Sequence, residues 1–260
     1  MSIIRSTELP YHFLIFSPDC PTFLTALEEK IGLDFRAFRI KNSSPMKNFP
    51  IRLSKLSFLL AYFAILFHTA FAADEKPLVE DDFERTELGK GWTIQTGAWE
   101  IREGALHGAE IPEDNHSAAA RRVVQTTDAT YQMKFRLTEG AKAFHFGFDP
   151  ARGELKKRGH LFSVIISPKG WRIMKHVDKD RPKEDPNEVL ATASNSFETG
   201  KWYSLEVVTD GTSVTATIDG FAPLKAEHPT FGVKKPTLVY RVIGDGVDID
   251  DISVKSNAAE

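Results

Sequence analysis

Three side chains of the kinds that exchange protons lie in one short stretch of the sequence, namely His145, Asp149 and His160. A carboxylate and two imidazoles can act as general acid and general base. His145 lies between phenylalanines, so it could equally be a hydrogen-bonded structural histidine. The three residues are candidates for a catalytic site only if loops bring them together, and the sequence assigns no catalytic residue.

The segments around these residues alternate between apolar and polar side chains. In TYQMKFRLTEG and in AFHFGFDP every second residue is apolar, which is the period of a half-buried strand. Further strand pairs are predicted in HLFSVIISPKGWRIMKHV around Ser167 to Gly170, in KWYSLEVVTDGTSVTATIDG around Asp210-Gly211, and in WEIREGALHGAE around Glu103-Gly104. About ten to twelve strands without a helix predict an all-β sandwich of two antiparallel sheets over residues 78–255, followed by a tail at 256–260.

Two charged stretches interrupt the alternation. The segment from Asp178 to Glu188 holds two prolines and is rich in charge, so we expect a solvent-exposed loop. The basic run Lys156-Lys157-Arg158 is also expected to be a solvated loop.

Carboxylates near the first and last predicted strands form a candidate metal site. Asp82 lies near the first strand, and Asp248 and Asp250 lie in the last. If the terminal strands pair, these oxygens could hold Ca²⁺, which takes six to eight oxygen ligands. The alternative is that they solubilise an edge strand. A change of phase between Ile249 and Ile252 predicts a bulge, and no HExxH pattern indicates zinc.

The segment LSKLSFLLAYFAILFHTAFAADEKP has the parts of a secretory signal. Basic residues precede an apolar run of roughly a dozen residues, shorter than the ~20 that span a bilayer, and Ala70-Phe71-Ala72 is a cleavage signal. We expect translation to begin at Met46, a signal peptide at 46–72, cleavage between Ala72 and Ala73, and a short linker at 73–77. Residues 1–45 would be a non-native or disordered leader. The alternative is an uncleaved anchor at 56–72.

Charge and cysteine content narrow the class of protein. Beyond residue 72 the chain has 25 Lys and Arg against 31 Asp and Glu, a net charge of −6. This acidic balance argues against nucleic acid as a partner, and the membrane is expected to meet only the signal segment during export. Cys20 is the one cysteine. The exported part, periplasmic or extracellular, would therefore be held by packing and not by disulfides.

Four segments carry a resemblance to a known family: DDFERTELGKGWTIQTGAWEIREGALHGAE, YQMKFRLTEG, GKWYSLEVVTDGTSVTATIDG and DIDDISVK. Together they resemble the secreted concanavalin A-like domains of the 3-keto-disaccharide hydrolase family, also described as family-16 glycoside-hydrolase-like or laminin-G-like. The likeness extends over nearly all of residues 78–255, and its motifs are signatures of fold. It implies a jelly roll of two curved sheets whose concave face or rim meets carbohydrate.

Sugar recognition needs aromatic rings for stacking and planar polar groups for the hydroxyls. Trp171 and Tyr240 are the predicted rings, whereas Trp92, Trp99 and Trp202 belong to the fold signatures and are predicted core residues. The polar candidates are Lys134, Arg136, His145, Asp149, Ser163 and Arg241, with His116 at a loop exit.

The strand that corresponds to the catalytic strand of this fold lacks the carboxylates that carry out catalysis. Glycoside hydrolysis normally uses two carboxylates, and glycosidases of this fold carry them as Glu-x-Asp-x-x-Glu on one strand. The corresponding strand here, HLFSVIISPKG, has no carboxylate. The first hypothesis is therefore an exported carbohydrate-binding domain without catalysis. The alternatives are a glycosidic-bond hydrolase of the 3-keto-disaccharide type and a laminin-G-like protein-interaction module.

Overall fold

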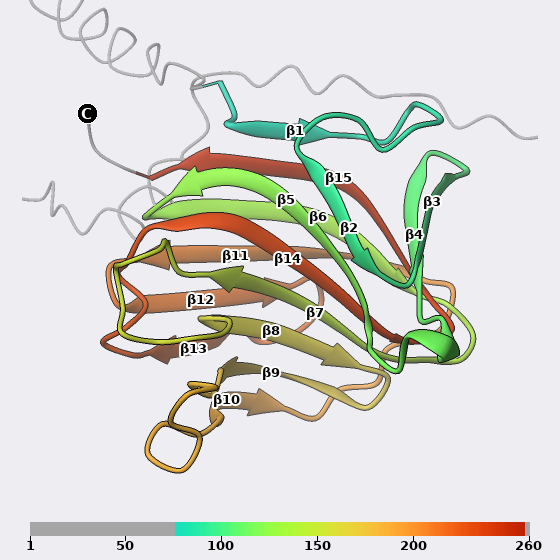
Figure 1. Ribbon diagram of the computed structural model, residues 1–260. Coiled ribbons are helices and arrows are strands. Elements are labelled where there is room, and N and C mark those ends of the chain that lie inside the picture. The colour runs from blue at the N-terminus through green and yellow to red at the C-terminus, as the bar shows by residue number, and fades with distance from the viewer. Residues whose placement is uncertain (1–75, 258–260) are drawn as a thin grey trace, which may run out of the picture. The chain divides into compact units, whose positions relative to one another are not determined.

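The computed structural model describes residues 76–257 (Figure 1). The predicted leader, signal peptide, cleavage point and Cys20 lie outside the described residues, as do most of the linker and the end of the tail. Within residues 76–257 no helix is long and apolar enough to cross a membrane.

Fifteen strands in two antiparallel sheets make up the described part of the chain, with one 3-10 helix, η2 (Pro112–Asp114). Sheet A has the order β13-β12-β11-β6-β15-β4-β3, with β1 also paired to β15, and sheet B has the order β10-β9-β8-β7-β14-β5-β2. The strands of sheet A are β1 (Val79–Asp81), β3 (Ala98–Arg102), β4 (Ala105–Ala109), β6 (Ala129–Leu137), β11 (Trp202–Asp210), β12 (Ser213–Ile218), β13 (Leu224–Glu227) and β15 (Val247–Ser256). Those of sheet B are β2 (Trp92–Thr96), β5 (Ala118–Thr126), β7 (Ala141–Asp149), β8 (Phe162–Ser167), β9 (Gly170–Lys175), β10 (Glu188–Ala193) and β14 (Lys235–Gly244).

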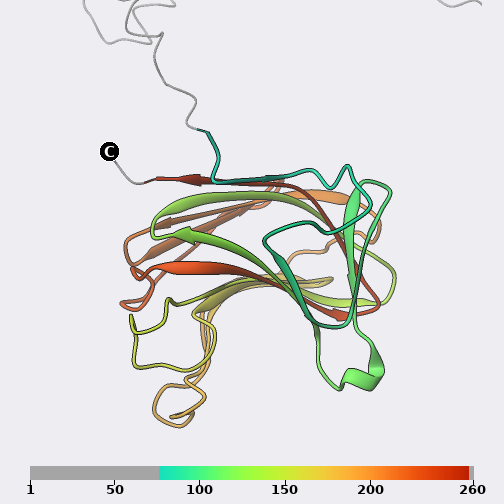
Figure 2. The same cartoon turned by 45° about the horizontal axis from the view of Figure 1, so that its top comes forward.

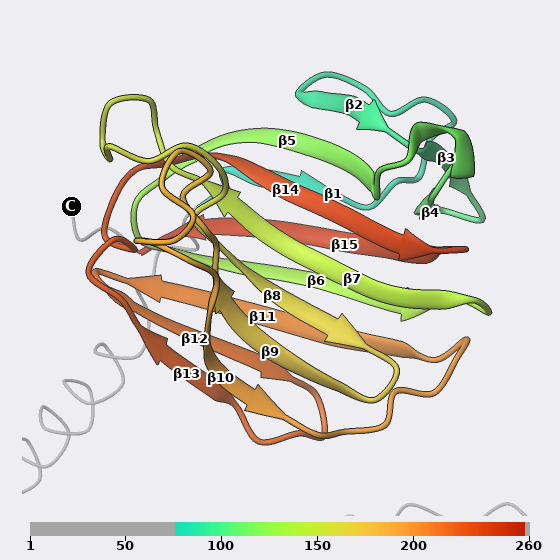
Figure 3. The same cartoon turned by 60° about the horizontal axis from the view of Figure 1, so that its bottom comes forward.

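This arrangement confirms the predicted all-β sandwich. Figure 3 shows β7, β8, β9 and β10 running side by side in sheet B. The sequence predicts fewer strands than the structure has, because a short strand such as β13 carries too few residues to show a clear alternation.

The predicted hairpins form where the turn residues allow them. Arg102 pairs with Ala105, so the loop is Glu103-Gly104, and both loop residues have positive φ, 52° and 72°. Positive φ at both positions is the requirement of a type I′ turn. The β11–β12 hairpin is also confirmed, although Asp210 pairs with Ser213, which moves its loop to Gly211-Thr212.

The last two strands of the fold enter the middle of both sheets. β14 pairs with β7 and β5 in sheet B, and β15 pairs with β6 and β4 in sheet A. β1 pairs with β15 as expected for the terminal strands, and the two lie next to each other in Figure 1. The register of β15 shifts between Asp250 and Ser253, and Asp251 there has φ 47°. This confirms the predicted bulge.

The core between the sheets is rich in aromatic rings. Phe144, Phe146 and Phe148 of β7 are all fully buried, and Phe146 and Phe148 meet edge to face with their centroids 5.0 Å apart. Such pairs add about 0.5–1.5 kcal/mol to the gain from burial. The inward phenylalanines fix the register of β7, because a shift of one residue would turn all of them to solvent.

Two predicted ligand-binding rings belong to this core. Trp171 is 1% exposed, and its indole N–H donates to Asn195 Oδ1 at 3.1 Å. Tyr240 is 0% exposed and its ring lies 5.2 Å from that of Trp92. The prediction that Trp171 and Tyr240 stack on sugar is wrong, because the alternation of β9 and β14 turns both side chains inward.

Candidate functional site

A groove of about 590 Å³ lies over the face of sheet B that turns away from the core. Its floor is formed by outward side chains of β5, β7 and β14, and its walls come mainly from residues 150–160. Figure 2 shows this loop and the segment 110–117 projecting from the same side of sheet B, at opposite ends of it. Ligand pockets typically have volumes of about 300–1,000 Å³.

The alternation of β7 turns its polar residues to the face of sheet B that carries the groove, and Asp149 lines it. With its phenylalanines in the core, His145, Gly147 and Asp149 must face outward. Gly147 lies close to the neighbouring strand, since a Cβ there would lie 2.4 Å from Ser163 Oγ. A glycine inside a strand often marks a place where another group approaches closely.

Asp149 is the centre of a charged cluster in the groove. Its Oδ1 lies 2.6 Å from His160 Nδ1, and its Oδ2 lies 3.1 Å from Arg121 Nη2. The side chains of Asp149 and His160 are each 18% exposed. The carboxylate therefore fixes the orientation of the imidazole ring while the ring stays accessible. The loop that joins β7 to β8 thus brings together two of the three proton-exchanging residues predicted from the sequence.

His145 and Arg241 lie opposite each other on β7 and β14. Burial, and then the positive charges of Arg241 and Arg172, lower the pKa of His145 to about 4, so this ring is neutral at neutral pH. Its Nδ1 is buried and has no hydrogen-bond partner among the described residues. Arg241 donates to Ser117 Oγ from Nε at 3.1 Å and from Nη2 at 2.6 Å. Burial lowers the pKa of this guanidinium.

A serine–histidine pair beside the groove was not predicted. Ser163 Oγ lies 2.7 Å from His176 Nε2, and both residues are buried. Burial lowers the pKa of His176 to about 3, and His160 and His145 add to the shift. The rings of His160 and His176 meet edge to face at 5.5 Å. The sequence held a signal for it, because the alternation of β9 turns Arg172 and Met174 outward and, continued by two residues, turns His176 to the same outer face of sheet B.

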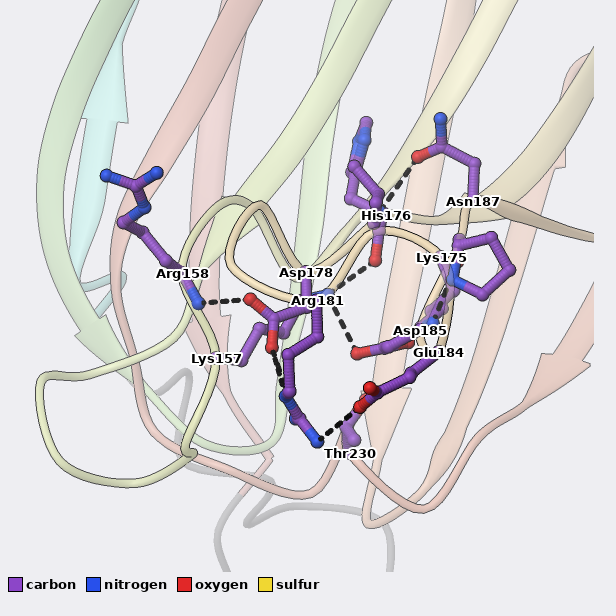
Figure 4. Close-up of polar contacts among 12 residues, drawn as sticks. Lys157, Arg158, Lys175, His176, Asp178, Arg181, Glu184, Asp185, Asn187 and Thr230 are labelled. Carbon is purple, nitrogen blue, oxygen red and sulfur yellow. Dashed lines mark hydrogen bonds and ion pairs between the residues drawn. The ribbon is translucent and has the colours of Figure 1, made fainter.

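The loop after β9 is largely solvent-exposed, as predicted, but it begins with a buried carboxylate that anchors it. Asp178 is 1% exposed and accepts hydrogen bonds from the backbone N–H of Arg158 and from Arg181 Nε (Figure 4). The backbone N–H of Asp180 donates to the same carboxylate. The backbone N–H of Arg158 is the largest cause that lowers the pKa of Asp178. The loop 178–188 is thereby tied to the wall of the groove, and Lys179 lines that groove.

Lys157 is also not the solvated side chain that was predicted. Its side chain is 4% exposed, and its ammonium lies 3.6 Å from Asp185 Oδ2 and donates to the His176 carbonyl at 2.5 Å. Lys175 pairs with the same carboxylate. These contacts join the two loops at one end of sheet B (Figure 4).

The remaining polar candidates are divided between the two sheets. Ser163, Arg241 and His116 belong to the sheet B side, where His116 lines the groove and its Nδ1 lies 2.7 Å from the Ser117 carbonyl oxygen. Lys134 and Arg136 lie on β6 of sheet A and do not reach this groove.

Arg136 lies instead on the outer face of sheet A, beside an exposed tryptophan. Its guanidinium carbon is 4.7 Å from the centroid of the Trp202 ring. Trp202 is 36% exposed, so the prediction that it is a core residue is wrong, whereas Trp92 is buried as predicted. Trp99 is partly buried against the core.

Asp248, one of the carboxylates considered for a metal, is committed to other partners. Asp248 is 1% exposed and lies 2.7 Å from both His107 Nδ1 and Arg136 Nη2. Burial alone raises the pKa of Asp248, but the hydrogen bonds from His107 and Arg136 outweigh it and lower the pKa. Among residues 76–257, no group of three Asp, Glu, His or Cys side chains is arranged to hold a metal ion. Asp82 and Asp250 therefore do not form a described calcium site with Asp248.

Comparison with known proteins yields likeness in structure only. The sequence matches no family model and no curated protein. Among solved structures, the carbohydrate-binding module CBM66 from Bacillus subtilis matches with a TM-score of 0.51 and 14% identity, over 64% of this chain and 96% of that one. SCLam, a non-specific endo-β-1,3(4)-glucanase of family GH16, matches with a TM-score of 0.54 and 11% identity, over 71% and 92%. A galectin-like protein from Bacillus subtilis matches with a TM-score of 0.52 and 13% identity, over 68% and 94%.

The chain has the concanavalin A-like jelly-roll fold. At these identities the likeness establishes the fold alone. The jelly roll found here carries its groove on the outer face of one sheet, where Asp149 is the one carboxylate among the described lining residues. The arrangement can orient hydrogen-bond donors toward a ligand and hold a histidine by a carboxylate.

Proposed function

We propose that this jelly roll is a carbohydrate-binding domain whose ligand lies in the groove over sheet B. The observation that carries the proposal is the convergence of Arg121, Asp149, His160 and Arg241 on one cavity of about 590 Å³. Planar guanidinium and carboxylate groups are well suited to pair with sugar hydroxyls. The matching folds of a carbohydrate-binding module and an endo-glucanase support the same class of ligand.

A glycan array followed by titration calorimetry on the purified protein tests this proposal. Arg121→Ala should weaken binding of whichever glycan scores, because it removes a donor from the groove and frees Asp149 and His160 to move. Lys225→Ala is the control, since Lys225 is exposed on β13 of sheet A. Equal loss in both variants, or no glycan bound, would contradict the assignment.

Hydrolysis of a glycosidic bond is the second candidate, favoured by the 2.6 Å contact between Asp149 and His160. A histidine oriented by a carboxylate can remove a proton from water. Against it, the described residues lining the groove offer one carboxylate where glycosidases normally use two. Incubation with ordinary and 3-keto disaccharides should show no turnover for a binding domain. Turnover that disappears in Asp149→Asn would establish the enzyme instead.

The proposal includes export of the protein, which is inferred from the signal-like segment 46–72. The mass of protein recovered from the periplasm or the medium should correspond to a chain that begins at Ala73. Recovery from the membrane fraction with segment 56–72 intact would support the uncleaved anchor.

A further inference from the structure

The groove has an excess of positive charge that its own carboxylates do not neutralise. Six cationic side chains and one carboxylate line it. Arg121 is paired with Asp149, Lys157 with Asp185 and Arg158 with Asp180. Arg152, Lys179 and Arg241 form no ion pair with any described residue. This positive groove belongs to a protein whose net charge is −3.

Arg241 is the most informative of these cations. It is partly buried on the floor of the groove, where burial lowers its pKa and the carboxylate of Glu110, which forms no ion pair with it, offsets only part of that effect. Its described hydrogen bonds go to the neutral hydroxyl of Ser117. The neighbouring His145 stays neutral, which limits the repulsion. A partly buried guanidinium held in place by a neutral acceptor is suited to a carboxylate or sulfate group brought by a ligand.

The groove also lacks the feature by which neutral sugars are usually held. No Phe, Tyr or Trp is among the described residues that line it, because the rings of β7, β9 and β14 are in the core. The same lack of rings disfavours single-stranded nucleic acid, whose bases stack on aromatic side chains. Recognition must therefore rely on charge and hydrogen bonds.

We infer that the ligand of the groove is an acidic saccharide, one with carboxylate or sulfate groups on its sugar rings. Arg241 binds one acidic group at the floor, and Arg152 and Lys179 bind further groups at the wall. This inference rests on the proposed function, and it adds the charge class of the sugar.

Matched saccharides that differ in charge alone provide the test. Calorimetry on the purified protein would compare oligogalacturonate with its methyl ester, and sulfated with unsulfated dextran oligosaccharides. Inorganic phosphate and a single-stranded oligonucleotide would be titrated as further probes. We expect an acidic saccharide to bind at least about tenfold more tightly than its neutral counterpart. Added NaCl should weaken this binding by screening.

Two variants and one control identify the cationic side chains that bind the acidic groups. Arg241→Gln and Lys179→Gln should each lower the affinity for the acidic saccharide several-fold. Lys225→Gln, which removes an exposed lysine from sheet A, should not. Lys179 is exposed, so its substitution leaves the fold intact even if that of Arg241 does not.

The outcomes separate this inference from the proposed function. Equal binding of charged and neutral partners, or an unchanged affinity in Lys179→Gln, overturns the acidic ligand and leaves carbohydrate binding standing. Binding of phosphate as tightly as of saccharide, or of the oligonucleotide alone, overturns the saccharide. Absence of any saccharide binding sinks both.

Discussion

Acid should destabilise this protein well above the range in which its carboxylates titrate, because two buried histidines are held neutral. The pKa values of His145 and His176 are lowered to about 4 and about 3, from 6.5. The unfolded chain therefore binds more protons than the folded chain between pH 6.5 and these values. Stability is full above pH 6.5 and falls as the pH drops through this window.

The size of the effect follows from the two shifts. One pKa unit corresponds to about 1.36 kcal/mol, and pH 5.0 is 1.5 units below the unfolded value. Each histidine should then cost about 2 kcal/mol between pH 7.0 and pH 5.0, and the pair about 4 kcal/mol. Asp81, Asp178 and Asp248 have lowered pKa values, so their contribution is lost only at lower pH.

Urea unfolding at pH 7.0 and pH 5.0, followed by tryptophan fluorescence, measures the difference. With a slope of about 2 kcal/mol per molar urea, the midpoint should fall by about 2 M in the wild-type protein. His145→Gln or His176→Gln should halve the difference, whatever either substitution does to stability at pH 7.0. Ile218→Val is the control, because Ile218 is buried on β12 of sheet A whereas both histidines belong to the sheet B side, so its loss of stability should be the same at both pH values.

The reasoning is refuted if the pH difference in the double variant His145→Gln, His176→Gln equals that of the wild type. The acid sensitivity would then come from other groups, and both imidazoles would be protonated in the folded state near pH 6.5. A wild-type difference below about 1 kcal/mol would lead to the same conclusion.

Three further predictions follow from single contacts. Gly147→Ala should lower the free energy of unfolding by about 1–3 kcal/mol, because the added methyl group overpacks the site. The loss should be smaller in a Ser163→Ala background, where the hydroxyl that the new methyl group meets is gone. A double-mutant cycle in urea measures this coupling. Asp248→Ala should cost about 1–3 kcal/mol because it leaves the buried His107 and the partly buried Arg136 without their acceptor. A loss below about 1 kcal/mol in urea unfolding would show that solvent compensates. Asp178→Ala should speed protease cleavage of its loop with little change in melting temperature, and an unchanged cleavage rate would mean the loop is held elsewhere.

The fold could be predicted from the sequence because its strands are long and one face of each is apolar. The phenylalanines of β7 alternate without interruption, and turn residues such as Glu103-Gly104 mark the hairpins. The prediction of side-chain direction failed where a turn did not fix the register of the strand that follows it. Trp171 follows Gly170, and shifting the count by one residue moves its ring from the core to the surface.

The candidate site was predicted in part. His145, Asp149 and Arg241 lie on clearly alternating strands, so their shared face follows from periodicity. The contact of Asp149 with His160 depends on a loop that periodicity does not describe. Asp178 was misjudged because its main partner, the Arg158 backbone, lies 20 residues away, and local charge density does not reveal such a partner.

The position of β14 and β15 governs how the polypeptide acquires its shape. Each fills the middle of its sheet, between strands formed much earlier in the chain. During synthesis, sheet B cannot close before β14 has emerged through Gly244, and sheet A cannot close before β15 has emerged through Ser256. Such long-range pairings slow folding. Until then the earlier strands carry open edges that can pair with other molecules, so a chaperone that shields them would protect the yield of this protein.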